Sequence, residues 1–90
     1  MKTIHLIISG SVQGIGYRQW IKHQAEKLRI AGWVTNRADG SVEAMVSGDD
    51  QNIDTLIKRA RQGPPFTHVA DITIVPYTKK ETFSSFSVLQ

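Results

Sequence analysis

The chain has 90 residues, a net charge of +3 and no cysteine, which predicts a single domain over residues 1–90 with no disulfide, thiolate chemistry or cysteine-bound metal. The mildly basic balance, with Lys and Arg scattered along the chain, favours small anionic ligands and lacks the pattern of a nucleic-acid-binding protein. No apolar run has the length of a signal peptide or a membrane-spanning helix, so we predict a cytoplasmic protein with no membrane association, in line with the lack of cysteine.

The first half of the chain predicts a strand, a loop and a helix. Apolar and polar residues alternate over Thr3–Gly10, which is the period of a strand with one apolar face. A glycine-rich loop follows. From Tyr17 to Ile30 the apolar residues recur every three or four positions, which predicts an amphipathic helix. Gly32 is expected to end this helix.

The second half predicts a hairpin, a helix and two further strands. Asp39-Gly40 readily supplies the positive φ of a tight turn, which indicates the hairpin. A carboxylate at Asp49 or Asp50 is expected to cap the second helix, and Gly63 is expected to end it. The predicted elements are, in order, strands over Trp33–Arg37 and Val42–Val46, a helix around Ile53–Ala60, a strand over Val69–Val75, a polar loop over Thr78–Ser85 and a short strand over Phe86–Val88.

The predicted order of elements is βαββαβ with a short C-terminal strand. This order is typical of the α+β ferredoxin-like split βαβ sandwich, in which two helices cover one face of an antiparallel sheet. The fold hosts many functions, so the function has to be argued from particular residues.

The loop of residues 10–18, GSVQGIGYR, connects the first strand to the first helix. Its glycines permit positive φ and a close approach to the backbone, and successive N–H groups in such a turn can hold an anion. The helix start adds free N–H groups and the positive end of its dipole, and Arg18 adds a planar fork of donors suited to phosphate. These features predict a phosphate cradle, although glycine turns of this kind also serve only to reverse the chain. The spacing fits neither a P-loop nor a dinucleotide fingerprint.

Two blocks of the sequence resemble the signatures of the acylphosphatase family. The first is residues 8–18, ISGSVQGIGYR, and the second is residues 32–43, GWVTNRADGSVE, followed by Gly48. The blocks have the order and separation typical of that family, and the resemblance extends over essentially the whole chain. The departures from the family pattern are Ser11, where a basic residue is common, Thr35, where a longer and often basic residue is usual, and Ile15 and Tyr17, which replace Val and Phe.

The resemblance implies hydrolysis of acyl phosphates to a carboxylate and inorganic phosphate, by water and without a metal or cofactor. The backbone N–H groups expected to hold the phosphate oxygens are those of Gly14, Ile15, Gly16, Tyr17 and Arg18. The Arg18 guanidinium is expected to neutralise the charge on these oxygens, and Asn36 to orient the attacking water through its amide. The resemblance also implies a monomer whose partners are the acyl phosphate substrate and inorganic phosphate, the product and an inhibitor; no nucleic-acid or membrane partner is expected.

Two other functions remain open at this point. A nonenzymatic ferredoxin-like module could bind an anion or RNA, but RNA recognition needs stacking aromatics on the central strands, and Glu43–Ser47 has none. A carbamoyl-phosphate-binding domain like that of larger hydrogenase-maturation proteins would be joined to a partner domain, and none is expected after Gln90. The three histidines have no metal-ligand spacing, and Asp39 and Glu43 are expected to be solvated.

Overall fold

The elements of the fold follow the predicted order. The computed structural model describes residues 1–14, 16–77 and 81–89. Its elements are β1 (Lys2–Ser11), α1 (Tyr17–Lys27), β2 (Ala31–Asn36), β3 (Val42–Gly48), α2 (Asp50–Gln62), β4 (His68–Pro76) and β5 (Phe86–Val88). The loop predicted over Thr78–Ser85 lies partly outside the described residues.

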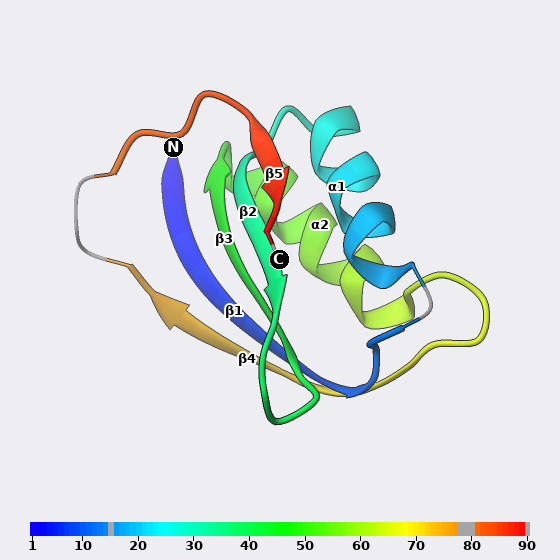
Figure 1. Ribbon diagram of the computed structural model, residues 1–90. Helices are drawn as coiled ribbons and strands as arrows, with labels where there is room; N and C mark the ends of the chain where they lie inside the picture. Colours follow the sequence, from blue (N-terminus) through cyan, green and yellow to red (C-terminus); the bar gives the residue numbers. More distant parts are fainter. Residues whose placement is uncertain (15, 78–80, 90) are drawn as a thin grey trace.

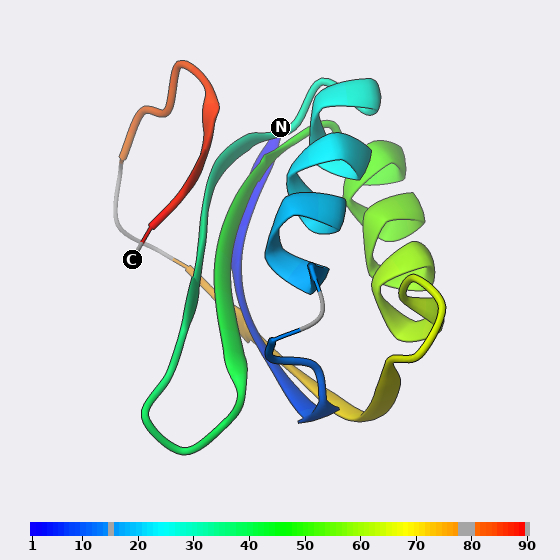
Figure 2. The same ribbon diagram turned by 45° about the vertical axis from the view of Figure 1, so that its right-hand side comes forward.

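The strands form a sheet in the order β4-β1-β3-β2-β5. Neighbouring strands are antiparallel except β2 and β5, which run parallel, so the sheet is mixed. Both helices lie against the same face of the sheet (Figure 1, Figure 2). The predicted ferredoxin-like α+β fold is therefore confirmed. The short C-terminal strand β5 is added at the edge of the antiparallel sheet, where it runs parallel to β2.

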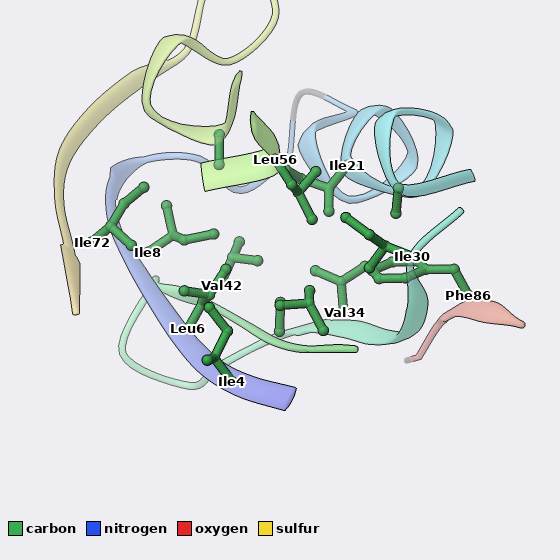
Figure 3. Close-up of a cluster of buried hydrophobic side chains, with 14 of the residues drawn as sticks. Ile4, Leu6, Ile8, Ile21, Ile30, Val34, Val42, Leu56, Ile72 and Phe86 are labelled. Atoms are coloured by element: carbon green, nitrogen blue, oxygen red, sulfur yellow. The ribbon is translucent and has the colours of Figure 1, made fainter. Parts of the chain in front are cut away.

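The apolar core lies between the sheet and the two helices (Figure 3). Strand β1 alternates as predicted, because Ile4, Leu6 and Ile8 are buried while the residues between them are partly exposed. In α1, Ile21 is buried in the same core. Burying one such side chain stabilises the fold by about 1.5–3 kcal/mol. The core therefore holds the end of β1 and the start of α1 in fixed positions on either side of the glycine-rich loop.

The first helix is shorter than predicted and ends for a different reason. It ends at Lys27 and not at Ile30, and the chain turns at Arg29, which has a φ of 55°. The N–H of Ile30 donates to the carbonyl oxygen of Ala25 at 2.8 Å, as in a Schellman motif. Gly32, predicted to end the helix, instead lies inside β2, where a Cβ would come within 1.8 Å of the Met45 carbonyl oxygen. Its role is the close approach of β2 and β3.

Candidate active site

The loop between β1 and α1 has the backbone conformation expected of a cradle. Val12 is 1% exposed and anchors this loop in the core. Gly14 and Gly16 have positive φ values of 79° and 81°, a conformation that other residues rarely adopt. A Cβ at either position would meet nothing within 4 Å, so the loop is open on this side. Glycine is therefore required here by the positive φ and not by a lack of space. Ile15, one of the predicted phosphate-binding residues, lies outside the described residues.

Helix α1 begins at this loop without a capping side chain. Gly16 is its N-cap, no side chain in the described part of the chain bonds to this cap, and the first turn contains no acidic residue. The first N–H groups of a helix have no partner within it, and the helix dipole makes this end positive. The loop and the helix start line a cavity of about 220 Å³. The residues in its wall are Val12, Gly14, Gly16, Tyr17, Arg18, Gln19 and Val88. An anion in this cavity would meet unpaired N–H donors and a positive potential.

Arg18 supplies the positive side chain of the cavity. It is half-buried and donates from Nη1 to the carbonyl oxygen of Leu89 at 3.0 Å. Within residues 1–14, 16–77 and 81–89, no carboxylate forms an ion pair with Arg18. The guanidinium has further N–H donors in a planar fork, and these can bind phosphate oxygens while the bond to Leu89 holds the side chain in place.

Tyr17 contributes to the cavity through its position at the start of α1, while its ring lies in the core. The side chain is 1% exposed, and its hydroxyl donates to the carbonyl oxygen of Ala60 at 2.7 Å. Burial raises the pKa of Tyr17, so the phenol stays neutral at physiological pH. The hydroxyl therefore connects the beginning of α1 to the end of α2, and only the backbone N–H of Tyr17 is available to an anion.

Asn36 is the last residue of β2 and is not among the described residues that line the cavity. Two hydrogen bonds connect its strand to Arg18, because the N–H of Leu89 donates to the carbonyl oxygen of Val34 at 2.8 Å and the carbonyl oxygen of Leu89 accepts from Arg18. The Oδ1 atom of Asn36 is buried and has no hydrogen-bond partner in the part of the chain that the structure describes. Buried acceptors are nearly always hydrogen-bonded, so this amide has unused capacity to bind.

Comparison with known proteins decides which family uses this arrangement. A family model described as Acylphosphatase matches residues 4–88. The chain belongs to the acylphosphatase family. It is 52% identical to the acylphosphatase of Acidiphilium cryptum over 68 residues, which cover 76% of this chain and 75% of the relative. It is 36% identical to the acylphosphatase of Methylococcus capsulatus over 90 residues, covering 100% of this chain and 98% of the relative.

The solved structures agree with this membership. The crystal structure of acylphosphatase from Bacillus subtilis matches the fold with a TM-score of 0.96 at 33% identity, and the match covers 100% of both chains. As an acylphosphatase the protein is a hydrolase, and the family implies an acyl phosphate as its substrate. The predicted resemblance, fold and activity are thereby confirmed.

In this acylphosphatase one side chain close to the cradle was missed by the sequence analysis. The Nε2 atom of Gln13 donates to the carbonyl oxygens of Arg37 and Ser41, each at 2.9 Å. These acceptors lie 24 and 28 residues further along the chain, so no local pattern indicates the contact. The only hint in the sequence is that polar Gln13 directly follows apolar Val12, which is buried in the structure.

The turn that receives these bonds is itself held by a carboxylate. Asp39, expected to be solvated, is exposed but also accepts hydrogen bonds from Ser41 through the hydroxyl at 2.5 Å and the backbone N–H at 2.9 Å. Because Ser41 donates both bonds to the carboxylate, the pKa of Asp39 lies below its ordinary value. Asp39 therefore stabilises the β2–β3 turn.

Other polar groups lie away from the cradle. Glu43, also expected to be solvated, is half-buried, and its Oε2 lies 2.6 Å from Nε2 of His5. Within residues 1–14, 16–77 and 81–89, no group of three or more His, Cys, Asp or Glu side chains is placed to hold a metal ion. Over the same residues, no helix combines the length and apolar character needed to cross a membrane.

Proposed function

We propose that the cavity beside α1 binds the phosphoryl group of an acyl phosphate and that the enzyme hydrolyses it by in-line attack of water, without a metal ion. The observation that carries this proposal is the cavity itself, whose wall combines the open loop at Gly14 and Gly16, the start of α1, where no described side chain bonds to the cap, and the guanidinium of Arg18. N–H donors from Gly14 to Arg18 would hold the phosphate oxygens, and the guanidinium would bind the same oxygens.

The chemistry of an acyl phosphate suits such a site. In hydrolysis the water oxygen forms a bond to phosphorus while the bond from phosphorus to the acyl oxygen breaks. The carboxylate leaves as a stable anion and needs no proton, and the proton of the water can pass to a phosphate oxygen. The protein therefore has to position the reactants and stabilise charge on the oxygens, which are the tasks of donors and a cation.

Asn36 is the residue we assign to the water. An amide offers both donor and acceptor atoms, and rotation about its terminal torsion can turn either atom toward a water molecule. Its Oδ1 has no hydrogen-bond partner among the described residues, and Leu89, which directly follows β5, links the strand of Asn36 to Arg18. Since an amide is a poor base, we assign it orientation of the water and not removal of its proton.

We also propose that residues 1–90 form one domain that acts as a monomer in the cytoplasm. The match of the family model to residues 4–88 supports a single domain, and the lack of cysteine is compatible with a reducing compartment. Light scattering after size exclusion, and fractionation of cells that produce the protein, test the two remaining points.

Hydrolysis of benzoyl phosphate, followed by absorbance with EDTA present, tests the proposed reaction. We expect full activity in EDTA and competitive inhibition by inorganic phosphate, because the product occupies the cradle. Sulfate should inhibit in the same way. Loss of activity in EDTA that added Mg²⁺ restores would contradict the metal-free reaction.

A further inference from the structure

A single side-chain amide connects the two regions that the proposed reaction requires to act together. Gln13 directly precedes Gly14 of the cradle, and its acceptor Arg37 directly follows Asn36. The two hydrogens of Nε2 go to the carbonyl oxygens of Arg37 and Ser41, so the amide bridges the two sides of the β2–β3 turn as well. We propose that Gln13 is a positioning residue for hydrolysis, which sets the place of Asn36 relative to the phosphate; this inference rests on the roles proposed above for the cradle and Asn36.

Both ends of this connection are held firmly. On the cradle side, Val12 is 1% exposed in the core. On the turn side, the N–H of Arg37 donates to the carbonyl oxygen of Ser41 at 2.8 Å, and Asp39 binds the hydroxyl and N–H of Ser41. Because the cradle loop and the β2–β3 turn are each held in place, hydrogen bonds between them fix the distance that separates them.

The chemistry of the glutamine side chain fits this role. One nitrogen carries two hydrogens and can therefore serve two carbonyl acceptors at once. A carboxylate of the same shape has no hydrogen to donate and would repel both carbonyl oxygens. A methionine has similar length but donates nothing, so it removes the bonds with little change in volume.

Besides the pairing of the sheet, in which Ile8 of β1 and Asn36 of β2 both lie opposite Val42, a second side-chain connection to β2 passes through Arg18. Arg18 donates to Leu89, whose N–H donates to Val34. A group that binds substrate changes its bonding during the reaction, so it is a poor reference point for Asn36. Gln13 touches neither the substrate nor the water in the proposed reaction, and it can keep its two bonds throughout.

The effect of losing this connection should appear in turnover. A displacement of about 1 Å in a reacting group can lower a rate by roughly 10²-fold. We therefore expect Gln13→Met to lower kcat by about 10- to 100-fold on benzoyl phosphate. The Kd of inorganic phosphate should stay within about threefold, because the cradle donors and Arg18 are unchanged.

A double-mutant cycle with Asn36→Ala tests whether Gln13 acts through Asn36. In the Asn36→Ala background, Gln13→Met should change kcat by less than about twofold, because no water remains positioned for it to disturb. Gln24→Met is the matched control: the Gln24 amide also bridges two elements, accepting a bond from Arg59 at 2.9 Å, and it does not line the cavity. This control should leave kcat unchanged. Calorimetry with phosphate and a melting curve on each variant show that it is folded.

The outcomes separate this inference from the proposed function. An unchanged kcat in Gln13→Met, or equal losses with and without Asn36, overturns the inference and leaves the assignment of Asn36 in place. An unchanged kcat in Asn36→Ala overturns the assignment of Asn36 and the inference with it. If Gln13→Met does not fold, Gln13→Ala, which removes the amide without adding charge, is measured instead, and the same losses and the same non-additivity are expected of it.

Discussion

The two helices begin in opposite electrostatic ways. At the start of α1, the N-cap is Gly16 with a φ of 81°, the first turn contains no acidic residue, and Arg18 is its second residue. At the start of α2, the N-cap is Asp49 in an extended conformation, and Asp50 lies in the first turn. No described side chain forms a hydrogen bond to this cap, so the predicted carboxylate cap is wrong, and the two residues contribute only their charge. Both helix starts have unpaired N–H groups and the positive end of a dipole.

This difference separates a binding end from a structural end. Asp49 and Asp50 place negative charge at the positive end of α2, so this end repels an anion although no described side chain bonds to its cap. The start of α1 has positive charge added to an already positive end, which destabilises it until an anion binds. In the proposed function, the affinity of this helix start for phosphate offsets the lower stability of the helix. Substitutions at either helix start, or in the region that acts with α1, test this difference.

The largest expected effect comes from removing the cation at α1. Arg18→Ala should raise the barrier by about 3–4 kcal/mol, because it removes a set of charge-stabilising donors. This corresponds to a fall in kcat/KM of roughly 10²–10³-fold, with weaker phosphate binding. Arg18→Lys should recover little of the loss, since a point charge cannot reproduce the planar fork. Steady-state kinetics and calorimetry measure both effects, and near-normal kcat/KM in Arg18→Ala would remove Arg18 from the reaction.

Asn36→Ala should have the next largest effect, and a different signature. Because Asn36 is proposed to orient water and not to bind phosphate, kcat should fall by roughly 10²-fold while the phosphate Kd changes little. If Asn36 only stabilises the end of β2, the substitution should lower Tm by a few degrees and leave kcat nearly unchanged. Measuring kcat, Kd and Tm on one variant decides between the two roles.

Much of this site could be predicted from the sequence, because its binding half is local. Two glycines, a helix start and Arg18 lie within a few residues of one another, and the alternating pattern of β1 places the loop at the end of a buried strand. The contacts of Gln13 and the links that bring Asn36 toward the site depend on chain segments that meet only in the folded sheet. The end of α1 was mispredicted because Arg29, and not a glycine, adopts the positive φ that ends it.

An acidic residue placed at the start of α1 should make the charge at this helix start resemble that at the start of α2. Gln19 lines the cavity in the first turn, and Gln19→Glu adds a carboxylate that competes with phosphate for the helix N–H groups. We expect the phosphate Kd to rise by about 30-fold, since like charges about 8 Å apart repel by about 2 kcal/mol at an effective dielectric constant of about 20. The helix should gain stability, so Tm should not fall. Unchanged phosphate affinity would show that the start of α1 does not bind the anion.

The reverse change at α2 should have the smallest effect, and only on stability. Asp50→Asn removes the acidic residue of the first turn, which lies on the surface. A surface charge at a helix start contributes about 0.3–1 kcal/mol at low salt, so Tm should fall by a few degrees and the difference should shrink as salt screens it. Because the proposed function places the anion at α1 and not at this end, kcat and phosphate Kd should match those of the unmodified protein. A fall in phosphate affinity would mean that the two helix starts are coupled, and the separation into a binding end and a structural end would then be wrong.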